Sequence, residues 1–506
     1  MDAQSGPKAV DTQPADAAGA TGAPEQSGVI DPNGLGPFRL TMVAVTTCVG
    51  AGIFSLSGDL AAGGANTAAV LVSWGICFVG VLSLMMCFHG LSQARPELTG
   101  GIFSYAAAGF GDFVGFSSAW GYWISSCLTN ASYALMLFGA LSYFFPVFED
   151  GNNLPSIVCA SAYLWFLTYL LSRGVKEATG VNLVITLAKL VPLGMFVVLV
   201  LLLRKFDPAI FLDNLWGEAG GPDFVAQVTS TMIALVWVFV GIEGAVVVSG
   251  RAKYVRDVGR ATVSGFVLVF ILYVLISVLS LGIMPRAEMA ELATPSLAGI
   301  FERAIGPVGA TIVNLGVVLS LVGAMLGYLI LASEVPHEAA VKGVFPKAFE
   351  RKNSHGAPVV TAVTSAAVTQ AFFILAAVAG GTYQFFYNCA VNAILIPYVC
   401  SCAYYMGIAW KNEHLDGPFA PKLGVARLFG TLGFLYTLLL VYVSGLHGVM
   451  VMCVAIAPGI VVYVIGQRQR GREVLPTTLE RLFAIVLVVL AVVALALHVT
   501  GIEPIV

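Results

Sequence analysis

The stretch VGAGIFSLSGDLA at residues 49–61 places Gly50 and Gly52 in the middle of the first long apolar segment of the chain. A second cluster, GIEGA at 241–245, interrupts the sixth long apolar segment in a matching place. Glycine costs about 1 kcal/mol relative to alanine inside a helix, so both clusters favour unwinding. An unwound backbone at membrane depth persists only where protein buries it or where it lines a wet cavity. The alternative is that these glycines serve close helix packing.

The composition indicates that much of the protein surface faces lipid rather than water. The chain has 506 residues, of which 58% are hydrophobic and 10% are charged, whereas soluble domains carry about 25% charged residues. The excess apolar surface must face lipid, which predicts an all-α polytopic membrane protein. The formal net charge is −3, and no basic stripe indicates a nucleic-acid partner.

A membrane-spanning helix needs about 20 mostly apolar residues. By this criterion the sequence predicts about 12–13 spans. The candidate segments are 38–62, 68–91, 113–145, 155–173, 179–203, 224–249, 261–284, 308–332, 358–380, 384–410, 425–444, 446–466 and 480–499.

The placement of Lys and Arg predicts the orientation, because cytoplasmic loops are enriched in both. With the N-terminus in the cytoplasm, 20 of the 25 Lys and Arg residues lie in the N-terminal tail and the inner loops. The outer loops then hold four, and Lys189 lies within a span. Residues 1–34 lack hydrophobic periodicity and are expected to be a disordered cytoplasmic tail. We expect a multi-pass protein of the cell membrane.

The two glycine clusters lie in the first and sixth spans, which begin two groups of five. An odd number of spans inverts the second group relative to the first, and paired broken helices in inverted repeats mark a transport site at the bilayer midplane. The expected organisation is a tail at 1–34, one repeat at 35–203, its inverted copy at 204–410, and further spans at 411–506.

Two charged side chains fall clearly inside spans, Glu243 and Lys189. A charge at the bilayer centre costs about 2.5–3.5 kcal/mol on the insertion scale. Glu243 follows the second glycine cluster, where a cavity would be wet, and is interpreted as part of the site, or alternatively as a helix-end partner of Arg251 or Lys253. Lys189 either has a proton-linked role or caps the carbonyls of a broken helix.

Trp237 lies about 20 Å into the sixth span, which is too deep for an interfacial belt. It either packs in the core or presents its ring to a cation. The nine cysteines lie in apolar runs and are expected to be packing residues, so we predict neither a metal site nor a cofactor.

The chain resembles the basic amino acid/polyamine antiporters of the amino acid–polyamine–organocation superfamily, and within them the arginine/ornithine antiporters. The resemblance rests on VGAGIFSLSGDLA at 49–61, PELTGGIFSYAAAGFGDFVGF at 96–116, WVFVGIEGAVVVSGRAK at 237–253 and KGVFPKAF at 342–349. It implies a leucine-transporter-like fold with broken first and sixth helices, and it allows a homodimer.

The resemblance also implies roles for individual residues. The substrate carboxylate would meet the backbone amides of Ala51, Gly52 and Ile53, and the α-amino group would meet carbonyls near Trp237 and Val240. The remaining positions implied by the family pattern are Trp237 as a ring that covers the substrate, Glu243 for gating, Tyr122 and Asn130 for the substrate or the gate, Tyr328 where a relative has Trp, and Thr47 where that relative has Asn. Lys189 resembles a lysine that takes the place of sodium in some members.

We therefore expect exchange of cationic amino acids or amines, arginine for ornithine, by alternating access without sodium. A proton-coupled amino acid symporter is the alternative within the same class. An intramembrane hydrolase is an alternative from another class, since Gly115-Phe116-Ser117-Ser118-Ala119 faintly resembles a nucleophile turn, although no His and acid complete a triad.

Overall fold

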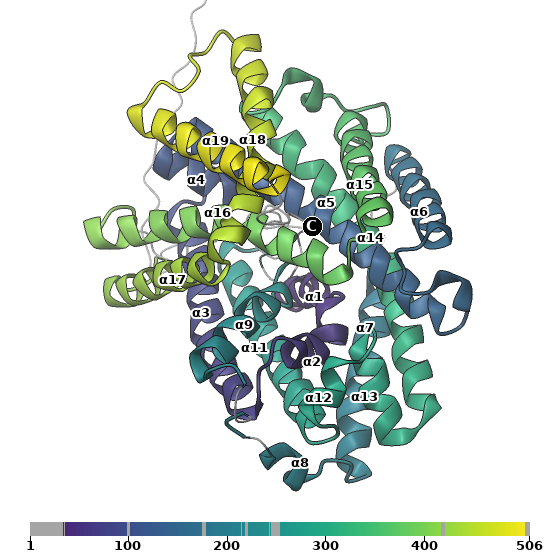
Figure 1. Ribbon diagram of the computed structural model, residues 1–506. Coiled ribbons are helices and arrows are strands. Elements are labelled where there is room, and N and C mark those ends of the chain that lie inside the picture. The colour runs from purple at the N-terminus through teal and green to yellow at the C-terminus, as the bar shows by residue number, and fades with distance from the viewer. Residues whose placement is uncertain are drawn as a thin grey trace, which may run out of the picture.

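The computed structural model describes residues 34, 36–98, 102–174, 179–213, 215–217, 221–241, 243, 253–415 and 420–500 (Figure 1). The regular elements of this part of the chain are all helices. The predicted tail at 1–34 lies almost entirely outside the described residues.

The helices of the first half run from the N-terminus to the second predicted break. They are α1 (Pro37–Cys48), α2 (Gly52–Ala62), α3 (Thr67–Ala94), α4 (Ile102–Phe110), α5 (Asp112–Ser142), α6 (Leu154–Ser172), α7 (Thr179–Leu202), α8 (Pro208–Leu212) and α9 (Phe224–Trp237), with a 3₁₀ turn at Pro146–Phe148.

The second half continues with longer helices and two short ones on a connecting loop. They are α11 (Val255–Leu281), α12 (Arg286–Ala290), α13 (Ser296–Ile305), α14 (Pro307–Val341), α15 (Val359–Ala379), α16 (Tyr383–Lys411), α17 (Leu423–Val443), α18 (Gly445–Gln469) and α19 (Thr478–Val499), with a 3₁₀ turn at Lys347–Glu350.

Each of the thirteen predicted segments contains a helix. Ten helices in the described part of the chain are long and apolar enough to cross a membrane, and α1 and α2 together form one further span that is bent by 44°. The predicted fifth and sixth spans correspond to α7 and α9. The region before the third span forms the separate helix α4, since the chain turns at Gly111 with φ 98°.

The less apolar helices lie at the centre of the molecule, and the more apolar helices face the lipid. In the most apolar window of α5 the mean hydropathy is 1.3 and 89% of the residues are buried, whereas in α19 the values are 3.1 and 22%. A helix surrounded by protein can carry polar side chains because neighbouring helices satisfy them, and a lipid-facing helix cannot. Accordingly, α5 packs against α14 and α16, while α6 and α17 lie at opposite edges of the molecule in Figure 1.

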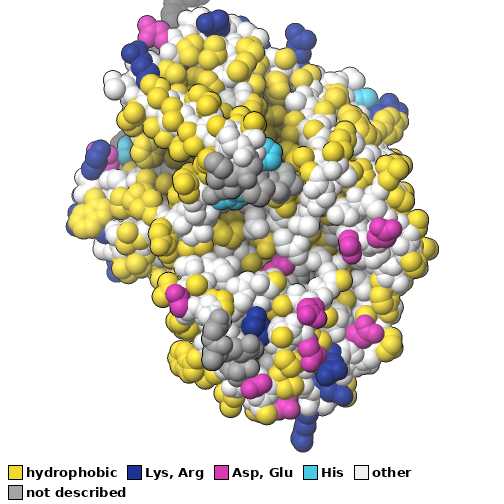
Figure 2. Space-filling model, in the orientation of Figure 1, with side chains coloured by type: hydrophobic (Ala, Val, Ile, Leu, Met, Phe, Trp, Pro, Cys, Tyr) yellow, Lys and Arg dark blue, Asp and Glu magenta, His cyan; other side chains and the backbone are white. Residues whose placement is uncertain are grey.

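The surface agrees with a bilayer environment. Figure 2 shows hydrophobic side chains over much of the visible face. Examples are Val378 at 82% exposure on α15 and Leu202 at 72% on α7. Exposed patches of this extent are not found on soluble monomers, so the belt of helices is built for lipid contact.

Candidate functional site

The first break separates α1 from α2. Helix α1 ends at Cys48, α2 begins at Gly52, and the residues between them, 49–51, are not helical. The break is therefore confirmed, and α2 begins within the glycine cluster, at Gly52. The first amides of α2 have no partner within the helix, so they are donors that an anion can bind.

The second break begins earlier than the glycine cluster indicated. Helix α9 ends at Trp237, four residues before Gly241. Gly241 has φ 99°, a conformation that suits glycine because it lacks a Cβ. A Cβ on Gly241 would also lie 2.5 Å from the carbonyl oxygen of Thr47. The rest of the predicted cluster, apart from Glu243, lies outside the described residues.

The two breaks are in direct contact. A Cβ on Gly52 would lie 2.8 Å from Cγ1 of Val238 and 2.9 Å from Cδ1 of Trp237. The Cys48 thiol donates to the carbonyl of Val238 at 3.3 Å. The sequence left open whether the glycines favour unwinding or close packing. Both interpretations hold, because the helices are interrupted here and the two unwound segments touch.

An aromatic cluster, formed by Trp237, Tyr133, Tyr328, Tyr383 and Tyr387, encloses this contact. The Trp237 ring stacks on Tyr387 at a centroid distance of 5.4 Å and an interplanar angle of 16°, and it meets Tyr133 edge-on at 6.1 Å. Tyr133 in turn meets Tyr328 at 5.2 Å. The Trp237 indole donates to the Tyr383 hydroxyl at 2.9 Å. Four helices, α5, α9, α14 and α16, thus bring together rings whose faces attract cations.

Glu243 lies on the far side of this cluster from α2. It is fully buried and accepts hydrogen bonds from the Tyr122 hydroxyl at 3.3 Å, the Tyr398 hydroxyl at 3.0 Å and the Gly241 amide at 3.1 Å. These donors account for a buried carboxylate without a cation, so the alternative pairing with Lys253 is not needed; Arg251 lies outside the described residues. The acid joins α5 and α16 to the second break.

Lys189 of α7 is buried and donates to the carbonyl of Thr46 at 2.9 Å. Thr46 lies in the last turn of α1, whose final carbonyls lose their helical partners at the break. The hydroxyls of Thr46 and Thr186 are also 2.6 Å apart. In this conformation Lys189 therefore caps a carbonyl at the end of the broken first span.

Asn130 of α5 hydrogen bonds to a turn of α14, and Tyr328 belongs to that turn. In the amide orientation that satisfies both of its polar atoms, Asn130 donates to the carbonyl of Met325 at 3.0 Å and accepts from the amide of Leu329 at 3.2 Å. These two groups are four residues apart, so the amide reaches into one turn of α14. Tyr328 lies within that turn and donates to the Val240 carbonyl at 3.4 Å.

Sequence reasoning missed Tyr133, Tyr383, Tyr387 and Tyr398. A signal existed for the first, because position 133 is eleven residues after Tyr122 and so falls on the same face of α5 three turns later. The tyrosines of α16 have no comparable spacing from a predicted site residue. They reach the site because of the way α16 packs against α5 and α9.

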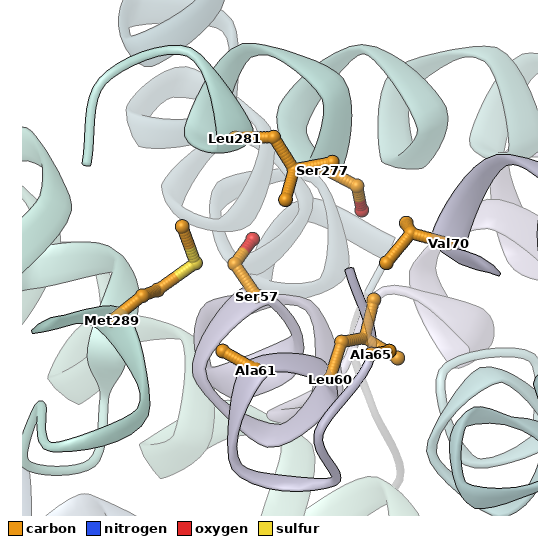
Figure 3. A pocket seen from close by; sticks show the side chains of 8 residues that line it. All are labelled: Ser57, Leu60, Ala61, Ala65, Val70, Ser277, Leu281 and Met289. Carbon is orange, nitrogen blue, oxygen red and sulfur yellow. The ribbon is translucent and has the colours of Figure 1, made fainter. Parts of the chain in front are cut away.

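Two cavities in the described part of the chain are each about 10 Å³, and one of them adjoins the second break, beside Val236, Phe239 and Tyr398. The other lies between α2 and α11, beside Ser57 and Ser277 (Figure 3). Both hydroxyls are buried and without a hydrogen-bond partner. A space of this size suits about one water molecule, whereas small-molecule pockets measure about 300–1,000 Å³. In this conformation the aromatic cluster fills the region between the breaks.

The hydrolase alternative is wrong. Ser117 lies within helix α5 rather than on a strand-to-helix turn, and its hydroxyl donates to the Phe113 carbonyl at 2.9 Å. The relatives of this chain described next are also transporters.

The chain matches a family model described as amino acid permease over residues 35–447. It is 38% identical to an arginine/ornithine antiporter of Pseudomonas aeruginosa, over 90% of this chain and 95% of that relative. It is 39% identical to a putative arginine/ornithine antiporter of Escherichia coli, over 87% and 93% of the two chains. It is also 34% identical to an arginine/agmatine antiporter of Chlamydia trachomatis, over 85% and 89%.

Proposed function

Because the chain belongs to the amino acid permease family, we propose that it exchanges cationic amino acids or related amines across the membrane, with arginine and ornithine as the preferred pair. The observation that carries this proposal is the aromatic cluster around Trp237, placed where two broken helices touch. The relatives, which are named as arginine/ornithine and arginine/agmatine antiporters, support the same substrate class. Exchange by a carrier is not enzymatic chemistry.

The site offers a distinct partner for each part of a cationic amino acid. The uncapped amides at the start of α2, from Ala51, Gly52 and Ile53, suit the carboxylate. Carbonyls at the end of α9, those of Trp237 and Val240, suit the α-amino group. For the cationic side chain, the aromatic cluster supplies ring faces, and Thr47 lies beside the second break.

Transport requires that the site open to one side at a time. We assign the gate on one side to Glu243 with Tyr122, because the pair joins α5 to the second break. On the opposite side, the Trp237–Tyr383 hydrogen bond joins α9 to α16. Both contacts are closed in this conformation, so alternating access means breaking one set while the other holds. We propose that the Glu243 side faces the cytoplasm, which the distribution of Lys and Arg supports.

We propose that no sodium is needed. The Lys189 ammonium already supplies a positive charge to the carbonyl end of α1, so a metal ion there would be repelled at close range. Arginine for ornithine exchanges equal charges and therefore needs no ion gradient.

Purified protein in liposomes tests the proposal. Radiolabelled arginine uptake is measured with ornithine inside, with no internal amino acid, and with internal leucine as a neutral control. We expect rapid uptake only with internal ornithine. Full uptake into empty liposomes would contradict exchange. A competition panel of ornithine, lysine, agmatine, histidine and putrescine then identifies the preferred pair.

A proton-coupled symporter is the second candidate, and the burial of Glu243 and Lys189 within the protein favours it. The two mechanisms differ in their driving force. A symporter takes up arginine into empty liposomes when a pH gradient is imposed, whereas an exchanger does not.

A further inference from the structure

An acid outside the proposed site, Asp59, lies on α2 between the aromatic cluster and the surface. Its side chain is half-buried, and its carboxylate accepts from the Ser55 hydroxyl at 2.9 Å and from the Gln384 amide at 3.1 Å. The same Gln384 nitrogen donates to the Thr294 hydroxyl at 3.1 Å. Among the described residues, no Lys or Arg forms an ion pair with Asp59.

Hydrogen bonds connect Asp59 to the aromatic cluster. The Ser55 hydroxyl lies 3.2 Å from that of Tyr383, which accepts from the Trp237 indole at 2.9 Å. Ser55 is the donor in both contacts, and because its hydroxyl has a single proton it serves Asp59 or Tyr383 but not both at once, which couples the two acceptors. Burial increases along this path, from half-buried Asp59 to fully enclosed Ser55 and Trp237, so Asp59 stands at its surface end.

The face around Asp59 is acidic. Helix α2 is fixed to α13 by a hydrogen bond from the Gly58 amide to the Ser296 hydroxyl at 3.0 Å, and Arg286 of α12 donates to the carbonyl of Ala61 at 3.4 Å rather than to Asp59. The described loops on this side carry four basic residues against eight exposed acids, which are Glu149, Asp150, Asp207, Asp213, Asp223, Glu288, Glu291 and Glu302.

Figure 2 shows several of the Asp and Glu side chains of the visible face in its lower half, where α12 and α13 lie in Figure 1. Charges of one sign around an opening raise the local concentration of oppositely charged solutes and speed their association. Cations are therefore favoured on the approach to Asp59.

The hydrogen bonds of Asp59 do not require its negative charge. A neutral asparagine could hold both Ser55 and Gln384, because its amide also accepts and donates. A carboxylate within a membrane-spanning segment carries a desolvation cost that an amide avoids. The charge itself therefore calls for a role in recognising something positive.

We propose that Asp59 is a specificity-determining residue that selects cationic over neutral substrates at the α2 side of the site, by exchanging its Gln384 partner for the guanidinium or ammonium group of the incoming molecule. This inference rests on the proposed function. When the substrate moves on to the aromatic cluster, the amide of Gln384 returns to Asp59 and joins α16 to α2 again.

The test compares arginine with citrulline, which has nearly the same shape without the positive charge. The transport KM for each is measured in liposomes for the wild type, Asp59→Asn, Asp59→Glu and Gln384→Ala. We expect Asp59→Asn to raise the KM for arginine about tenfold and to change that for citrulline by less than about twofold, the effect of losing one attracting charge. Asp59→Glu should restore the preference.

Gln384→Ala is the matched control, since it removes the hydrogen-bond partner and leaves the acid in place. It should preserve the ratio of the two KM values even if the rate changes. Equal effects of Asp59→Asn on arginine and citrulline, or an unchanged KM for arginine, would overturn the inference. Absence of arginine–ornithine exchange by the wild type would instead contradict the proposed function; the comparison is then made with the cationic substrate that the competition panel identifies and its neutral analogue.

Discussion

Trp237 is the side chain on which, in our proposal, recognition of the cation depends. It ends α9, stacks on Tyr387 and hydrogen bonds to Tyr383, so its ring is held firmly between the two breaks. A ring fixed in this way presents a constant face to a guanidinium, which strengthens a cation–π contact because little freedom is lost on binding.

Replacing Trp237 by Ala should weaken the binding of arginine more than the binding of neutral substrates. A desolvated cation–π contact contributes about 2 kcal/mol, which corresponds to a KM for arginine raised roughly tenfold or more. Trp237→Phe keeps a ring and should lose less. The measurement is the KM for arginine and for citrulline in liposomes, and an equal loss for both would remove the cation–π argument.

Glu243→Gln should flatten the pH dependence of transport. Glu243 binds three donors, from Tyr122, Tyr398 and Gly241, and its protonation would weaken the interactions that join these segments. Glutamine cannot titrate, so the rate should respond less to pH. Tyr398→Phe removes one donor while keeping the acid, and its profile should remain pH-dependent. The proposed role fails if the Glu243→Gln profile matches that of the wild type.

The start of α2 leaves no room for a side chain where it faces the second break. Gly52 touches both Trp237 and Val238 there. Because interiors resist overpacking, at a cost of about 1–3 kcal/mol, even one methyl group must shift the break.

Gly52→Ala should therefore abolish or strongly reduce exchange while the protein still folds. The added Cβ would lie within 3 Å of Val238 and Trp237. The matched control is Gly75→Ala on α3, where a Cβ meets nothing within 4 Å. Arginine–ornithine exchange is measured for both, together with size-exclusion chromatography to confirm folding. Normal exchange by Gly52→Ala would show that the breaks need not touch during transport.

Helix α19 packs against α18, and one buried acid adds a polar contact to the core. Glu480 accepts from the Phe113 amide at the start of α5 at 3.0 Å and forms a capping box with Thr477. The other buried residues of α19 are apolar, so Glu480 supplies its buried polar contact.

Glu480→Ala should lower stability by about 1–2 kcal/mol, because it removes a cap and leaves buried amides unpaired. Thermal unfolding in detergent measures the change, with Glu413→Ala, at an exposed acid after α16, as the control. Since α19 lies away from the breaks, the exchange activity of the folded fraction should persist. A melting temperature equal to that of the wild type would show that apolar contacts alone hold α19.

The whole molecule works as a carrier only if two closed regions on either side of the aromatic cluster open in turn. Glu243 links α5 and α16 on one side, while Trp237 and Tyr383 link α9 and α16 on the other. Helix α16 is common to both, so its movement relative to α5 and α9 is where we expect the conformational change.

Exchange should proceed at the same rate when potassium replaces sodium on both sides of the membrane. The physical reason is the Lys189 ammonium at the carbonyl end of α1, which holds the charge that sodium would otherwise provide. Initial rates of arginine–ornithine exchange in matched buffers measure this. A strict dependence on sodium would overturn the assigned role of Lys189.

The sequence by itself determined the spans, the two breaks and the family. Hydropathy and the local cost of glycine act within one segment, so Gly50, Gly52 and Gly241 could be recognised without knowing their neighbours. The early end of α9 at Trp237 lay beyond that reasoning, because the conformation there depends on contacts with Thr47 and Gly52.

Only the tertiary structure decided which side chains meet. Tyr387 stacks on Trp237, Tyr398 binds Glu243, and Asp59 reaches Gln384, although each pair is more than 100 residues apart in the sequence. In a helix surrounded by protein nearly every face is buried, so apolar periodicity no longer shows which face meets which neighbour. The packing angles between α2, α9 and α16 fix these contacts, and no local pattern encodes them.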